Sequence, residues 1–90
     1  MNKVESISDM QVNQELLVTY LSINDAKPIR MRSLGDFGPT NGSKVYLCKS
    51  ESSETPESMA KKFESNLMPD CVVCWDFQIG TDFEIHKFEA

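Results

Sequence analysis

An α+β fold is predicted: one antiparallel sheet with a single helix packed on one of its faces, in the chain order strand, strand, strand, helix, strand, strand. Three observations predict it. About five short stretches are rich in β-branched, aromatic and aliphatic residues. Only residues 55–68 combine helical spacing with start and stop signals. A chain of 90 residues has room for one core. A small, partly open β-barrel with an inserted helix is the alternative.

The first strands form a predicted hairpin over residues 16–34. The run from Leu16 to Ile23 suits a pleated surface, residues 24–28 carry the turn formers Asn, Asp and Pro, and residues 29–32 alternate apolar with Arg. A helix over 8–22 remains the rival interpretation, since several apolar residues there also fit helical spacing. Residues 1–14 are predicted to be a polar tail that docks partly, and residues 15–90 the single domain.

Residues 35–43 are rich in Gly and are predicted to form a loop. A strand is predicted over 44–49, and the helix follows it. Thr55 stands where an N-cap hydroxyl is needed, and Pro56 occupies the first turn, where its missing N–H costs nothing. Met59, Phe63 and Leu67 repeat at intervals of four residues and form an apolar stripe. Pro69 is predicted to stop the helix.

Residues 71–90 are predicted to form a second hairpin. A three-residue turn, 80–82, opposes Ile79 to Phe83 and Phe77 to Ile85, and so places the apolar residues on the core face. On the outer face this register opposes Cys74 to Phe88 and Asp76 to His86. The strand over 82–89 is predicted to lie at a sheet edge, where it can pair with a second copy in a homodimer.

The distribution of charge along the chain indicates the kind of partner that the protein would bind. Fourteen acidic and nine basic residues give a net charge of -5; residues 1–49 carry +1 and residues 50–90 carry -6. This acidic half predicts a protein partner with a basic surface, such as a nucleic-acid-binding site, and argues against direct nucleic-acid binding. No apolar run approaches the roughly 20 residues of a membrane span, so no membrane association is expected.

The cysteines suggest a compartment and two alternative chemistries. Three cysteines are an odd number and the first residues lack a signal-peptide core, so a cytoplasmic location without disulfides is expected. One alternative is a Cys3His zinc module that uses Cys48, Cys71, Cys74 and His86. The other is a thiol-dependent enzyme with Cys74 as nucleophile, His86 as base and Asp76 to orient it. The glycine-containing loop lacks phosphate-loop spacing, and no cofactor is predicted.

The main functional prediction is a non-enzymatic, acidic protein-binding module that inhibits its partner by steric occlusion. Small inhibitors encoded by phages and mobile elements, including those that block CRISPR or restriction complexes, share this size and charge, which is an analogy of class. Aromatic anchors and complementary carboxylates are the residue types that such a surface needs. The predicted partner-binding residues are Phe37, Asp76, Asp82, Glu84, Phe88 and Glu89.

Overall fold

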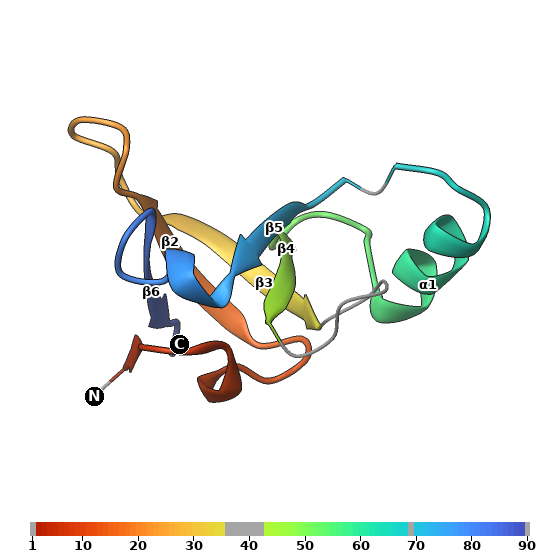
Figure 1. Ribbon diagram of the computed structural model, residues 1–90, viewed down its shortest axis with the longest axis horizontal. Helices are drawn as coiled ribbons and strands as arrows, with labels where there is room; N and C mark the ends of the chain where they lie inside the picture. The colour runs from red at the N-terminus through yellow and green to blue at the C-terminus, as the bar shows by residue number, and fades with distance from the viewer. Residues whose placement is uncertain (1, 36–42, 69, 90) are drawn as a thin grey trace.

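The computed structural model describes residues 2–35, 43–68 and 70–89, and it confirms the α+β class. One antiparallel sheet, which is not closed into a barrel, carries the only α-helix of these described residues, α1 (Pro56–Glu64), at one end of the molecule (Figure 1). Within the described residues the sheet has six strands in the order β1-β6-β2-β3-β4-β5. The strands are β1 (Lys3–Val4), β2 (Glu15–Tyr20), β3 (Ile29–Gly35), β4 (Lys44–Lys49), β5 (Val72–Trp75) and β6 (Phe83–Lys87).

The first predicted hairpin is confirmed. β2 and β3 pair antiparallel, with Leu16 opposite Met31, and a register shift at the end of β3 is accompanied by a positive φ of 98° at Gly35. The rival helix over 8–22 is wrong, because only η1 (Ile7–Asp9), one turn of 3₁₀ helix, precedes β2. The start of the chain joins the sheet: β1 pairs with β6, and Val4 is buried. Most of the predicted 35–43 loop lies outside the described residues.

The second predicted hairpin is wrong. β5 pairs with β4, whereas β6 lies between β1 and β2, at the other end of the strand order. The predicted edge strand is therefore an interior strand, and β1 and β5 form the edges. Of the predicted pairing only Ile79 with Phe83 remains, as an isolated bridge. Alternating apolar residues define the two faces of a strand but do not select its neighbour, which is why the register argument failed.

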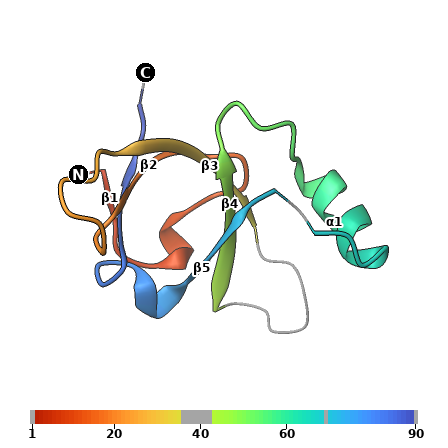
Figure 2. The same ribbon diagram turned by 90° about the horizontal axis from the view of Figure 1, so that it is seen from above.

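Two hydrophobic clusters cover opposite faces of the sheet. Figure 2 shows α1 on the side of β3 and β4, away from β1 and β2. The first cluster, which we call the main core, is covered by the apolar residues of η1 and of the segment that leads into β6. Its buried members are Val4, Leu16, Val18, Met31, Val45, Leu47, Cys74, Phe83 and Ile85. The second, the helix core, joins α1 to β3 and β4 through Leu34, Tyr46, Cys48 and Met59, with Cys71 and Val73 packed against it.

Helix α1 begins as predicted and ends earlier. The Thr55 hydroxyl accepts a hydrogen bond from the Ser58 amide at 3.0 Å, and Pro56 is the first helical residue. The helix ends at Glu64, several residues before Pro69, and the backbone turns away through Asn66, whose φ is 58°. Leu67 consequently lies beyond the helix and is 59% exposed, so the predicted apolar stripe is shortened. Among the described residues no helix has the length and apolar character needed to span a membrane.

A buried carboxylate forms hydrogen bonds that stabilise the segment that contains α1. Glu54 is 3% exposed and accepts hydrogen bonds from Lys62 Nζ and Ser58 Oγ, both at 2.6 Å, and from the backbone amide of Asp70 at 2.7 Å. The Arg32 guanidinium, reaching from β3, donates to the carbonyl oxygen of Glu54 at 2.9 Å. The hydrogen bond from Lys62, followed by those from Ser58 and Asp70, lowers the pKa of Glu54 to about 2. We call this set the Glu54 network.

The Glu54 network predicts an acid-sensitive contribution to stability. Because the pKa of Glu54 lies below its ordinary value of 4.5 in the folded state, the charged form stabilises the fold above that value, and the stabilisation is lost as the pH falls toward 2. Glu54→Gln is expected to lower the free energy of unfolding at neutral pH by roughly 2–3 kcal/mol. Urea denaturation across this pH range is the measurement.

The difference between wild type and Glu54→Gln should shrink on acidification. Exposed Glu51 provides the matched control, and Glu51→Gln is expected to change stability by less than about 0.5 kcal/mol. A Glu54→Gln variant whose stability runs parallel to the wild type down to the lowest pH would show that the carboxylate charge contributes nothing.

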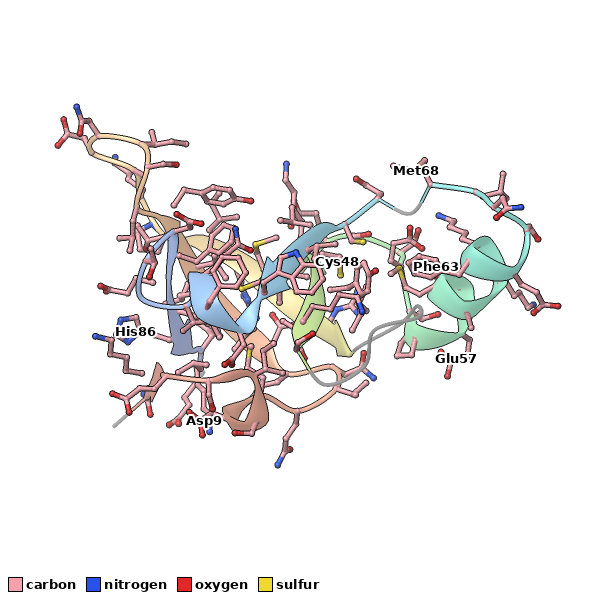
Figure 3. All side chains as sticks on the ribbon, viewed as in Figure 1. Asp9, Cys48, Glu57, Phe63, Met68 and His86 are labelled. Atoms are coloured by element: carbon pink, nitrogen blue, oxygen red, sulfur yellow. The ribbon has the colours of Figure 1, made fainter. Side chains whose placement is uncertain are left out.

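Two methionines test whether α1 is an integral part of the fold. Met59 is 0% exposed in the helix core, whereas Met68 is 91% exposed. Figure 3 shows Met68 on the segment that follows the helix. Met59→Ala is expected to cost about 2–5 kcal/mol, since it leaves a cavity, and Met68→Ala less than about 0.5 kcal/mol. Equal unfolding midpoints for the two variants in thermal denaturation would mean that α1 does not pack as described.

Candidate functional site

The predicted catalytic thiol set is not assembled. Cys74 is 0% exposed in the main core and lies opposite Val45 on β4, not opposite Phe88. His86 alternates with the main-core residues of β6 and so lies on the other face of the sheet, where its Nε2 is 2.9 Å from Glu84 Oε2. Asp76 is not paired with His86; its Oδ1 accepts a hydrogen bond from the Ile7 amide at 2.9 Å. Burial raises the pKa of Cys74 to about 11, with Asp76 and Asp82 contributing.

The predicted zinc ligands are also divided between different places. Cys48 and Cys71 pack in the helix core, Cys74 belongs to the main core, and His86 lies well apart from Cys48 (Figure 3). In the described part of the chain no group of three or more His, Cys, Asp or Glu side chains could hold a metal ion. The Cys3His arrangement therefore does not form from these residues.

Three of the predicted partner-binding residues lie along the end of the chain. The Phe88 ring is half-buried and covered by the Arg30 guanidinium, whose Cζ is 4.2 Å from the ring centroid. Arg30 also forms an ion pair with Glu15 at 2.9 Å. Glu84 bonds to His86, which lowers the pKa of the Glu84 carboxyl; Glu89 is exposed. Phe88 is therefore not a free aromatic anchor. Phe37 lies outside the described residues.

The other two predicted carboxylates, Asp76 and Asp82, flank an exposed aromatic ring. Between β5 and β6 the chain forms η2 (Asp76–Gln78), one turn of 3₁₀ helix, which presents Phe77 with 73% of its surface exposed. Phe77 was predicted to face the core. We call the set of Asp76, Phe77, Gln78 and Asp82 the acidic knuckle.

Hydrogen bonds from neighbouring segments hold the acidic knuckle in shape. The Gln78 side chain accepts a hydrogen bond from the Trp75 amide and donates one to Asp82 Oδ2, both at 2.9 Å. The Asp76 amide donates to the carbonyl oxygen of Ser43 at 2.8 Å. At the return into β6, Gly80 has a φ of 85°, a conformation that glycine adopts without steric cost. Phe77 is thus exposed on a hydrogen-bonded turn.

The neighbouring turn η1 adds further negative charge. The hydrogen bond between the Ile7 amide and Asp76 places η1 beside the knuckle. Asp9 and Glu5 are both exposed on this segment, where Asp9 Oδ2 accepts hydrogen bonds from the amides of Glu5 and Ser6. In the described register one lysine of β4, Lys44, pairs with β5. Lys44 is only 4% exposed, and its Nζ lies 5.6 Å from the centroid of the Trp75 ring. Asp76 is an exposed carboxylate next to Phe77, and Glu5 and Asp9 are exposed on the adjoining segment.

A small cleft lies elsewhere on the molecule. It has a volume of about 90 Å³ and lies between β2, β3, β4 and the start of β5, with Tyr20, Met31, Cys48 and Cys71 among its lining residues. Pockets for small organic ligands usually occupy roughly 300–1,000 Å³, so this cleft is too small for a typical substrate or cofactor.

Sequence reasoning found the two carboxylates of the knuckle but missed its aromatic residue. The alternation of Val73, Trp75 and Phe77 is typical of a continuous strand, and the polar residues between them were assigned to its outer face. Two polar residues, Asp76 and Gln78, indicate that the strand ends here. Such side chains can accept hydrogen bonds from backbone amides that would otherwise pair with a neighbouring strand. In the structure both do so: Asp76 bonds to Ile7, and Gln78 to Trp75.

No protein-family model, no curated protein and no solved structure matches this chain.

The location of Cys74 predicts its reactivity. With 0% exposure and a pKa raised to about 11, Cys74 is expected to resist iodoacetamide at neutral pH until the protein unfolds, because the thiolate is the reactive species. Half-buried Cys71 should react before it. Mass spectrometry of timed samples measures both rates, with the protein in guanidinium as the control in which all three cysteines react. Rapid labelling of Cys74 in the folded protein would revive the catalytic-thiol hypothesis.

Proposed function

We propose that this protein is a non-enzymatic protein-binding module that inhibits a partner by occluding a basic, nucleic-acid-binding surface, and that the acidic knuckle makes the contact. The observation that carries the proposal is the exposure of Phe77, 73%, on a hydrogen-bonded turn between Asp76 and Asp82. The knuckle replaces the predicted contact built on Phe88. Glu84 and Glu89 remain proposed peripheral charges.

The shape of the knuckle favours binding. Aromatic side chains are prominent among the residues that contribute most to protein interfaces. A ring held out on a turn that is already ordered loses little conformational freedom when a partner covers it, so more of the contact energy appears as affinity. The bonds from Gln78 to Trp75 and Asp82 supply this order in the free protein.

The charge around the ring favours a basic partner. Asp76 and Asp82 flank Phe77, exposed Glu5 and Asp9 lie on the adjoining segment, and residues 50–90 as a whole carry a charge of -6. Carboxylates around an apolar anchor steer the approach of a positively charged surface and disfavour neutral or acidic partners. Surfaces that bind nucleic-acid backbones carry such clusters of Lys and Arg.

Occlusion is the mechanism that this geometry favours. A protruding ring can enter a recess in a partner while the acidic side chains occupy positions that phosphates would take. We propose that the protein acts in the cytoplasm as an inhibitor of the anti-defence type found in phages and mobile elements, directed at a protein that binds nucleic acid. The described residues assemble none of the predicted catalytic or zinc sets.

The proposal predicts a partner whose nucleic-acid binding is lost on stoichiometric addition of this protein. Partners would be captured from a lysate of the native cell on immobilised wild-type protein and eluted with a DNA competitor, and each purified candidate would be tested for DNA or RNA binding by fluorescence anisotropy. Candidates that keep their nucleic-acid affinity at saturating inhibitor would contradict the mechanism.

Matched variants test the surface itself. Phe77→Ala is expected to weaken binding to that partner at least tenfold, about 1.4 kcal/mol, whereas Met68→Ala, at the α1 end of the molecule, should bind like wild type. Glu5→Lys should slow association and reduce its salt dependence; Glu64→Lys on α1 is its control. Biolayer interferometry at several salt concentrations measures both rates. Equal affinities for Phe77→Ala and Met68→Ala would rule out the knuckle.

A further inference from the structure

Two cysteines pack in the helix core, Cys48 in β4 and Cys71 just before β5. The β4–β5 ladder opposes Lys44 to Trp75, Val45 to Cys74, Tyr46 to Val73 and Leu47 to Val72. Continuing this antiparallel register by one position opposes Cys48, in β4, to Cys71, the residue before β5. In this extended register the two thiols lie opposite one another on the same face of the sheet, whereas Cys74 lies on the other face.

The hydrogen-bond pattern of the ladder shows what kind of pair this is. The Asp76 amide donates to the carbonyl oxygen of Ser43, and these two residues occupy opposed positions in the same register. Hydrogen-bonded and non-hydrogen-bonded pairs alternate along antiparallel strands. Counting from residues 43 and 76, the extended register makes the position of Cys48 and Cys71 a non-hydrogen-bonded one.

Non-hydrogen-bonded pairs bring side chains close enough for a disulfide. Their Cα atoms lie roughly 4.5 Å apart, inside the range of about 4.4–6.8 Å found across disulfide bonds. Cys48 and Cys71 also pack in the same hydrophobic cluster, and the influence of Cys48 on the pKa of Cys71 places the two groups near one another. In the described structure both are free, and the Cys48 thiol donates to the carbonyl oxygen of Arg32 at 3.7 Å.

The two thiols differ in their exposure to solvent. Cys48 is 1% exposed, whereas Cys71 is half-buried, and both line the small cleft between the strands. An oxidant in solution therefore meets Cys71 first, and Cys48 is then the thiol in position to complete the bond.

We propose that Cys48 and Cys71 form a reversible disulfide when the protein meets an oxidised low-molecular-weight thiol such as glutathione disulfide. The Cys71 thiolate attacks one sulfur of glutathione disulfide, forming a mixed disulfide and releasing one glutathione thiolate. The Cys48 thiolate then attacks the Cys71 sulfur and releases the second. Two protein thiols are oxidised to one disulfide, one glutathione disulfide is reduced to two glutathiones, and the protons pass to the released thiolates.

The Cys48–Cys71 disulfide would close a loop that noncovalent contacts already stabilise. The 22 residues between Cys48 and Cys71 contain α1 and the whole Glu54 network, which ties Glu54 to Lys62 and to the amide of Asp70. Oxidation adds a covalent link across the base of this loop, next to Asp70. The helix core would then stay in place under conditions that weaken the Glu54 network. This inference stands independently of the proposed function.

The test treats folded wild-type protein with glutathione disulfide at mildly alkaline pH. Alkaline conditions are needed because burial, with Glu54, Cys48 and Asp70, raises the pKa of Cys71 to about 11 against the opposing effect of Lys62; burial also raises the pKa of Cys48. Trypsin places Cys48 in the peptide 45–49 and the other two cysteines in 63–87. Tandem mass spectrometry of the joined peptides then identifies the partner of Cys48.

The expected product is a Cys48–Cys71 disulfide in the folded protein. Cys74→Ala should form it as wild type does, and Cys71→Ser should not. Unfolded wild type in guanidinium should instead favour the Cys71–Cys74 bond, which closes the shorter loop. Oxidised protein should melt roughly 10 °C higher than reduced protein, and dithiothreitol should reverse the shift.

Three results would overturn the inference. One is a Cys71–Cys74 bond in the folded protein. A second is a reaction that stops at the mixed disulfide of Cys71, since this would show that Cys48 cannot reach the sulfur. The third is a Cys48–Cys71 bond that forms no faster than the protein unfolds, measured by hydrogen exchange under the same conditions, since the native register would then play no part.

Discussion

Phe83 and Ile85 reach the main core because β6 enters the sheet between β1 and β2. This placement joins both ends of the described chain: β1 pairs on one side of β6, and β2, with Tyr20 stacked edge-on against Phe83 at 5.1 Å, on the other. It also separates β6 from β5, the strand that precedes it, by three intervening strands. Residues 76–82 must therefore connect the edge strand β5 to the interior strand β6, and the acidic knuckle lies within this connection.

The two faces of the sheet are stabilised differently. Apolar burial dominates in the main core, to which all six described strands contribute buried side chains. The helix core is smaller, and polar contacts supplement it: Glu54 collects three donors, and Arg32 bonds to the backbone of the segment that leads into α1. A buried carboxylate is costly unless it is fully hydrogen-bonded. The partners of Glu54 meet that condition, so a charged group joins the helix to the sheet.

Sequence reasoning succeeded where the signals are local. The N-cap at Thr55, the strand over 44–49 and the first hairpin each depend on residues close together in the chain, and the structure confirms them. It failed for the last strands, because their neighbours are distant in sequence. The alternation of apolar and polar residues does not show which strand lies beside another. The site shows the same division. Asp76 and Asp82 were selected from composition and lie in the knuckle, but the exposure of Phe77 and the cover of Arg30 over Phe88 depend on tertiary contacts.

The insertion of β6 has a consequence for biosynthesis. Leu16 pairs with Lys87, so β2 acquires one of its two neighbours only after nearly the whole described chain has left the ribosome. Until then the nascent polypeptide has one side of β2 unpaired and the apolar residues of the first hairpin uncovered. Such long-range pairing slows folding, and uncovered strands attract other chains. Among the interior strands described here, β2 is therefore the one that waits longest for its second neighbour during translation.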